Sequence, residues 1–192
     1  STAATPTEGI ETLTIVASGA LSTITELDNL ADNVAATNQN INIEAAVDLT
    51  ITGFADDGEI SAITVSGAGD VTLGETGSRT TATQESSVNA SALTGSLTVD
   101  YQNLDGDLDS SVTGGSGADV IENRDTTTTT WVGDILADVA GGAGNDTIHV
   151  DGDLSQPTER DGDDGDVSVD GGAGDDTIVV AGDVSENAAV TG

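Results

Sequence analysis

The sequence predicts an all-β protein of the β-solenoid type, and three observations lead to this fold class. The apolar clusters are short, rich in β-branched residues and bounded by Gly, Asp, Asn or Ser, as in brief strands separated by turns. Within the clusters apolar residues alternate with Thr, Ser or Asn, so one face of each strand is expected to be buried. A glycine-rich unit also recurs at a spacing of about 30 residues, which is typical of stacked repeats.

The charge of the chain restricts its partners. The 192 residues contain 35 Asp or Glu and only three Arg, with no Lys, for a formal net charge of −32. A phosphate-binding surface needs clustered cations, so nucleic acid is excluded and anionic membrane surfaces are disfavoured. No apolar run approaches the ~18 residues of a spanning helix, so direct membrane insertion is not expected.

The composition also indicates that the fold needs a cross-link. Leu, Ile, Val and Phe make up about 22% of the chain, just above the ~20% level below which strongly charged chains stay disordered. The chain has no Cys, which excludes disulfides and thiolate metal sites. A divalent cation that gathers carboxylates would convert their repulsion into attraction, and calcium is the obvious candidate. The absence of Met, including at position 1, indicates a processed fragment or excised domain of a longer protein.

Short strands are predicted along the whole chain. In order they are Leu13–Val16, Ile41–Ile43, Leu49–Thr52, Ile63–Val65, Val71–Leu73, Leu97–Val99, Val120–Ile121, Ile148–Val150, Val167–Val169 and Ile178–Val180. One segment, Leu21–Ala36, has apolar residues at spacings of three or four and is either a helix or a turn between strands. The polar stretch 78–86 is a loop or a domain seam. It divides the chain into an irregular β-rich segment, 1–85, and a repeat-bearing solenoid, 86–192, or lies within one continuous solenoid.

The repeat that decides the interpretation has the form V-x-G-G-x-G-x-D-x-I. Its copies begin at Val112, Val139 and Val169, so they lie 27 and 30 residues apart. Glycine permits the sharp turns of such a unit because it can adopt φ > 0. The Asp adds a negative charge at the end of each turn, and the aliphatic residue two positions later points into the core.

This unit resembles the G-G-x-G-x-D-x-U-x nonapeptide of the RTX proteins, in which U is a large aliphatic residue. The resemblance covers residues 112–184 and implies a right-handed parallel β-helix whose C-terminal half has calcium-binding glycine-rich turns. It implies that Asp119, Asp146 and Asp176 bind Ca²⁺ through their side chains. The implied carbonyl ligands come from the turn glycines, which are Gly115, Gly117, Gly142, Gly144, Gly172 and Gly174.

Carboxylates between the repeats are expected to complete these sites. Tandem RTX arrays place their nonapeptides back to back, whereas single copies are separated here. Asp134, Asp153 and Asp183 each follow Gly and precede an aliphatic residue, a weaker version of the same signal. The acidic segments 105–109 and 161–166 are either further calcium ligands or solvated loops.

Catalysis is not expected, and the chain is predicted not to be an enzyme. His149 is the only His and occupies a strand position whose repeat equivalent is Val179, so we interpret it as a strand residue. Without Cys or a second His, the usual nucleophilic constellations cannot be built. A sugar site normally needs aromatic platforms, and the chain has three aromatic residues in total.

The acidic, Lys-free composition resembles the surface-layer proteins among the RTX proteins. This resemblance implies a structural extracellular protein that assembles with copies of itself, dependent on calcium, into a surface layer or filament. Two alternatives stay open, namely a calcium-stiffened segment of a large adhesin and the C-terminal secretion and folding module of an exported enzyme or toxin. The implied location is the bacterial cell surface, reached by type I secretion, and cell-surface polysaccharide is a partner that another domain would bind.

Overall fold

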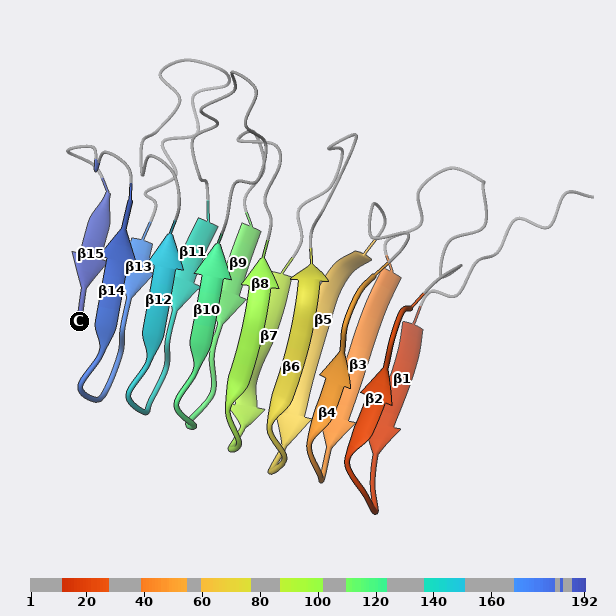
Figure 1. The fold of residues 1–192 in the computed structure, drawn as a ribbon. Coiled ribbons are helices and arrows are strands. Elements are labelled where there is room, and N and C mark those ends of the chain that lie inside the picture. Colours follow the sequence, from red (N-terminus) through yellow and green to blue (C-terminus); the bar gives the residue numbers. More distant parts are fainter. Residues whose placement is uncertain are drawn as a thin grey trace, which may run out of the picture.

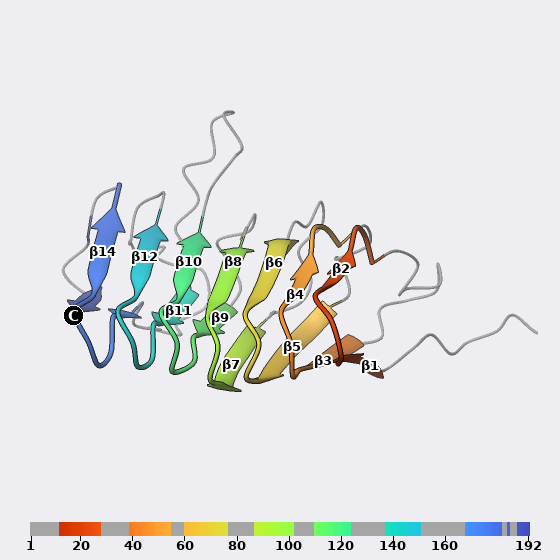
Figure 2. The ribbon, with the colours of Figure 1, turned by 60° about the horizontal axis from the view of Figure 1, so that its bottom comes forward.

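The computed structural model describes residues 12–27, 39–54, 60–76, 87–101, 110–123, 137–150, 168–181, 184 and 188–192. Within these residues the regular secondary structure consists of β-strands, and every paired strand is parallel to its neighbour. The strands form two sheets that face each other (Figures 1 and 2).

Odd-numbered and even-numbered strands occupy different sheets. The odd sheet contains, in spatial order, β1 (Thr12–Ala17), β3 (Gln39–Ala45), β5 (Ile60–Gly67), β7 (Ser87–Leu93), β9 (Ser110–Thr113), β11 (Ala137–Ala140), β13 (Ser168–Asp170) and β15 (Ala189–Thr191). The even sheet contains β2 (Ser22–Ile24), β4 (Leu49–Ile51), β6 (Val71–Thr76), β8 (Leu97–Tyr101), β10 (Val120–Asn123), β12 (Thr147–Val150) and β14 (Thr177–Val180).

Each odd strand and the even strand that follows it form one rung of a β-solenoid. The strands described make seven such rungs, and β15 adds the first strand of an eighth. Residues paired across neighbouring rungs lie 21 to 30 positions apart in the chain. The predicted all-β solenoid is thereby confirmed, while its right-handed winding and the metal in its turns stay predictions.

The predicted strands fall within observed strands, except that Thr52 lies just past β4 and Val167 lies outside the described residues. Of the two alternatives for Leu21–Ala36, the helix is wrong where the structure describes the segment. Ser22–Ile24 is strand β2, and Leu27 pairs with Phe54 in an isolated parallel bridge. The apolar spacing was misleading because Ile24 and Leu27 face the core from an extended segment. Residues 28–36 lie outside the described part of the chain.

Aliphatic columns run through the core because the parallel register aligns equivalent residues of successive rungs. In the odd sheet one column consists of Leu13, Ile41, Ile63, Val88, Val112, Val139, Val169 and Val190. In the even sheet the matching column consists of Ile24, Ile51, Leu73, Val99, Ile121, Ile148 and Ile178. These columns hold the two sheets together by burying apolar surface between them.

The even sheet is continuous across residue 85, because strands β6 and β8 pair directly. The candidate site lies at the turns of this continuous solenoid. Within each rung a short turn joins the odd strand to the even strand, and these turns stack along one edge of the solenoid (Figure 1). The turns of the second, third and fourth rungs have three residues, whereas the glycine turns of the next three rungs have six.

Candidate functional site

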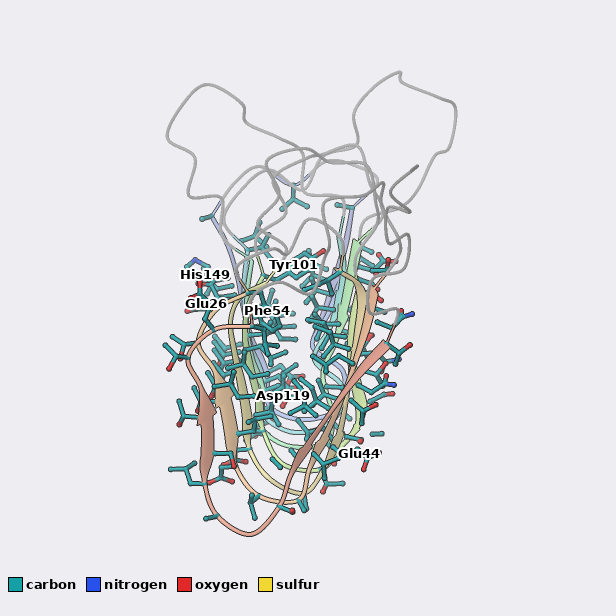
Figure 3. The ribbon with its side chains drawn as sticks, turned by 90° about the vertical axis from the view of Figure 1, so that its right-hand side faces the viewer. Glu26, Glu44, Phe54, Tyr101, Asp119 and His149 are labelled. Atoms are coloured by element: carbon teal, nitrogen blue, oxygen red, sulfur yellow. The ribbon has the colours of Figure 1, made fainter. Side chains whose placement is uncertain are left out.

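A column of residues at the start of the even strands changes its chemistry along the solenoid. We call it the Leu/Asp column. The register aligns its members as Ser22, Leu49, Val71, Leu97, Asp119, Asp146 and Asp176, where each Asp immediately precedes its strand. Leu97 is fully buried, and Asp119 and Asp146 are each only 1% exposed. The fifth to seventh rungs therefore place carboxylates where the second to fourth rungs place aliphatic side chains, and Asp119 points between the sheets (Figure 3).

Buried glycines opposite this column make room for the carboxylates. Gly114, Gly141 and Gly171 occupy equivalent positions just after their odd strands, at the level of Ala90 in the fourth rung. A Cβ atom on any of the three would lie closer than 3.0 Å to Oδ2 of the aspartate in the same rung. The first Gly of each repeat is thus paired with the Asp five positions later, a role that sequence reasoning missed although the glycine recurs in all three copies.

The aspartates are linked through the backbone of the preceding rung. Asp119 Oδ1 accepts a hydrogen bond from the Leu97 N–H at 2.7 Å, and Asp146 Oδ1 accepts one from the Asp119 N–H at 2.8 Å. Asp176 Oδ1 accepts one from the Asp146 N–H at 2.9 Å. The three predicted side-chain ligands are therefore brought together as a stack on consecutive rungs.

The second carboxylate oxygens are satisfied in one rung only. Asp119 Oδ2 accepts a 2.6 Å hydrogen bond from the Gly115 N–H. The Oδ2 atoms of Asp146 and Asp176 are buried without a hydrogen-bond partner. Burying a charged oxygen without a partner costs free energy, so a proton or a cation bound at these two atoms would stabilise the fold.

The repulsion between the stacked carboxylates also favours the binding of a proton or a cation. Burial raises the pKa of Asp119 despite the hydrogen bonds from Leu97 and Gly115, and the neighbouring Asp146 carboxylate raises it further. Burial likewise raises the pKa of Asp146, with a further contribution from Asp176. The Asp146 carboxylate thus opposes the ionisation of Asp119, and the Asp176 carboxylate opposes that of Asp146, because like charges in a poorly solvated site repel.

The turn glycines divide into two groups. Gly142, Gly144, Gly172 and Gly174 have φ values of +102°, +128°, +91° and +149°, so the expectation of positive φ is confirmed at these positions. Gly115 and Gly117 do not adopt positive φ. They are required for a different reason, since a Cβ on either would collide with backbone carbonyls of the preceding rung, at Leu93 and Gly95.

The oxygen atoms of the stack limit how a metal could be held. A Cβ on Gly141 would collide with both Asp146 Oδ2 and the carbonyl oxygen of Gly171, so these two oxygens both lie close to Gly141. In the same way, the carbonyl oxygen of Gly141 and Asp119 Oδ2 both lie close to Gly114. Among the residues described, no three Asp, Glu or His side chains lie close enough to hold a metal by themselves. A cation here would need one or two carboxylates together with glycine carbonyls, a donor set of the kind that Ca²⁺ accepts.

No family model, curated protein or solved structure matches the chain. Nor is there a helix in the described ranges that is long and apolar enough to cross a membrane. The RTX resemblance therefore stays a prediction, and the chemistry of this site is argued from its own geometry.

Two turn carboxylates of the N-terminal rungs were not among the predicted site residues. Asp48 Oδ1 accepts a hydrogen bond from the Asp70 N–H at 3.0 Å, and Asp70 Oδ1 accepts one from the Ser96 N–H at 2.8 Å. Hydrogen bonds from the backbone and the side chain of Ser96 lower the pKa of Asp70. Both aspartates are exposed and stand one position before the Leu/Asp column. The signals for them were an Asp directly before Leu49 and before Val71 and, for Asp70, its place in the segment 67–71, which is a shortened version of the repeat.

The remaining predicted site residues are placed as follows. Asp134, Asp153 and Asp183, together with segments 105–109 and 161–166, lie outside the described residues. His149 is a strand residue of β12, on the outer face of the even sheet and paired with Glu122 and Val179 (Figure 3). It does not belong to the carboxylate stack.

Proposed function

We propose that this chain is a structural extracellular protein that binds calcium in its C-terminal rungs and assembles with copies of itself into a layer or filament. The observation that carries the calcium part is the stack of carboxylates at Asp119, Asp146 and Asp176, of which the first two are buried residues and the last two have buried Oδ2 atoms without a hydrogen-bond partner. Calcium prefers carboxylate and carbonyl oxygens, and both kinds lie close to Gly141.

Calcium would act here as a cross-link. The residues that would hold it are the three aspartates, with backbone carbonyls of the glycine turns such as those of Gly141 and Gly171. When bound, the ion supplies positive charge that offsets the repulsion between stacked carboxylates and joins neighbouring rungs. At Kd values of ~10⁻⁴ to 10⁻³ M, typical of extracellular modules, a tenfold excess of free calcium stabilises by ~1.4 kcal/mol per site.

The two ends of the described solenoid support the assembly part. β1 and β2 each pair on one side only, as do β14 and β15. Large apolar side chains are exposed at both ends, namely Val16 and Leu21 in the first rung and Val179, Val184 and Val190 at the last. Strand edges and apolar groups of this kind favour pairing with a further strand, from another copy or from another domain of the same protein.

The extracellular location, the bacterial cell surface and export by type I secretion rest on the resemblance to RTX surface-layer proteins. Cell-surface polysaccharide stays a proposed partner of another domain. A calcium-stiffened adhesin segment is the main competitor, because a stack of rungs also makes a stiff rod. Calcium should cause a layer or filament protein to assemble, whereas an adhesin segment should stay monomeric in calcium.

The test combines titration with microscopy. Calorimetric titration of the purified chain with CaCl₂ should show saturable binding, and Asp146→Asn should weaken it about tenfold or more, as expected for the loss of a charged ligand. Glu44→Gln removes one exposed charge of the odd sheet and should leave the affinity nearly unchanged. Equal effects of the two variants would mean that the carboxylates act only as a diffuse cloud.

Assembly is tested on the same samples. Light scattering and electron microscopy in millimolar calcium should reveal sheets or filaments that a chelator disperses and that magnesium at matched ionic strength does not produce. A calcium-loaded chain that stays monomeric at high concentration would reject the assembly proposal and favour the adhesin segment.

A further inference from the structure

The interior of the solenoid changes at a single step between the fourth and fifth rungs. In the Leu/Asp column the change falls between Leu97 and Asp119. The position opposite this column changes at the same step, from Ala90 in the fourth rung to Gly114 in the fifth. Of the 24 buried apolar residues in the described ranges, 18 lie at or before Tyr101 and six lie after it. The four N-terminal rungs (β1 to β8) therefore hold most of the apolar core, and the three Asp rungs (β9 to β14) hold the buried charge.

The turn carboxylates on the two sides of this step accept hydrogen bonds from opposite neighbours, although the Asn145 side chain of the sixth rung still accepts from the rung that follows it, from the Asp175 N–H at 3.0 Å. In the N-terminal rungs each turn carboxylate accepts from the rung that follows it, as Asp70 does from Ser96. In the Asp rungs each carboxylate accepts from the rung that precedes it, as Asp119 does from Leu97. The turn of the fourth rung thus donates in both directions, through Ser96 N–H to one neighbour and Leu97 N–H to the other.

This arrangement gives the Asp rungs an order of dependence. Asp119 needs the Leu97 N–H, which belongs to a rung whose inward side chains are apolar and fully buried. Asp146 needs the Asp119 N–H, which is positioned only once the fifth rung is formed. Asp176 needs the Asp146 N–H in turn. In a solenoid each rung contacts only its neighbours, so structure spreads from the more stable repeats to the less stable ones.

We propose that the four N-terminal rungs fold without a metal and that the three Asp rungs add onto the fourth rung, in chain order, only when their buried charge is compensated. The fourth rung is thus the last rung that folds without a metal, and the rungs after it fold only when their buried charge is compensated. This inference rests on the proposed calcium function for the identity of the compensating ion, but the boundary and the order follow from the core and the hydrogen bonds.

Hydrogen exchange on the full chain, read by segment, tests the boundary. In chelator, amides of 39–54, 60–76 and 87–101 should stay protected, whereas those of 112–123, 137–150 and 168–180 should exchange about 100-fold faster than in saturating calcium. Equal protection of both groups in chelator would overturn the boundary. Loss of protection over the whole chain in chelator would also overturn it, while leaving calcium binding itself supported.

A matched pair of variants tests the order. In saturating calcium, Asp119→Ala should increase exchange throughout the Asp rungs, because the later rungs depend on the fifth. Asp176→Ala should increase exchange in 168–180 and leave 112–123 protected. If Asp176→Ala exposes the fifth rung as strongly as Asp119→Ala does, the proposed order is wrong.

One further variant separates this inference from the calcium proposal. Asp119→Asn with Asp146→Asn keeps an oxygen acceptor in each side chain and removes two buried charges. In chelator this double variant should regain protection in the Asp rungs, at least tenfold over the unmodified chain. That result supports the conditional core even if titration shows no calcium binding, and no gain in protection would overturn it.

Discussion

The backbone N–H of Asp119 donates a 2.8 Å hydrogen bond to Oδ1 of Asp146, one rung further along the solenoid, while Oδ2 of Asp146 is buried without a partner. One half of this carboxylate thus contributes to the regular pairing between rungs, and the other half carries a charge that nothing in the described chain offsets. The same side chain both specifies the stacking and destabilises it. This duality makes the Asp rungs responsive to protons and cations, and the predictions below are built on it.

Acidification should stabilise the Asp rungs in the absence of calcium. The folded-state pKa values of Asp119 and Asp146 are raised above the ordinary value of 3.8. Their contribution to stability is therefore fully present below about pH 3.8 and is lost as the pH rises through the raised pKa values. Each proton involved contributes a slope of up to ~1.4 kcal/mol per pH unit.

Urea unfolding in chelator between pH 4.5 and 7.5 measures this slope. The net charge of −32 acts in the same direction through general repulsion, so the comparison with Asp119→Asn plus Asp146→Asn is decisive. The double variant should have a clearly flatter profile. Parallel profiles would assign the pH dependence to general repulsion instead.

Replacing Gly141 by Ala should destabilise the fold by about 1–3 kcal/mol through overpacking. The new methyl group would collide with Asp146 Oδ2 and with the carbonyl of Gly171, both of which are fixed by the stacking of rungs. Gly53→Ala is the control, because its Cβ would have only one neighbour, Thr25 O, at 3.9 Å. Thermal unfolding in calcium should separate the two variants by several degrees, and equal melting temperatures would contradict the packing argument.

Truncating Leu97 to Ala should cost about 2–5 kcal/mol, because its side chain is fully buried where the two parts of the solenoid meet. The loss should appear both in chelator and in calcium. Leu21→Ala, at a side chain 71% exposed, should change the free energy of unfolding by no more than about 0.5 kcal/mol. Urea titrations of both variants provide the measurement, and a Leu97→Ala variant as stable as the Leu21→Ala variant would argue against the column as described.

Polar substitution at the first rung should weaken self-association without weakening calcium binding. Val16 and Leu21 are exposed in the first rung, where β1 and β2 have a neighbouring strand on one side only among the residues described, so Val16→Ser with Leu21→Ser removes apolar area from this end only. Light scattering in calcium should show assembly shifted to concentrations at least several-fold higher. Calorimetric titration serves as the control, and unchanged assembly would exclude this end from the contact.

Local sequence determined the strands and the turns of this protein. Alternation of Ile and Thr in segments such as Leu49–Ile51 specifies strands because side chains on a strand point to opposite faces in turn. The repeated G-G-x-G-x-D units specified where the chain reverses, and Gly142 and Gly172 adopt positive φ as their type allows. These features depend on a few neighbouring residues, so they can be read from the chain directly.

Tertiary structure alone decided which residues share a column. Asp119 lies at the level of Leu97, 22 positions earlier, because β10 pairs with β8 in one particular register. That register depends on the lengths of the connections between rungs, which vary irregularly, so the sequence did not show that an aspartate replaces a buried leucine. For the same reason the segment at Ser22–Ile24 is a strand rather than part of a helix, since pairing with β4 outweighs its local apolar spacing. The chemistry of single turns is local, but the burial of their charge arises only when the rungs stack.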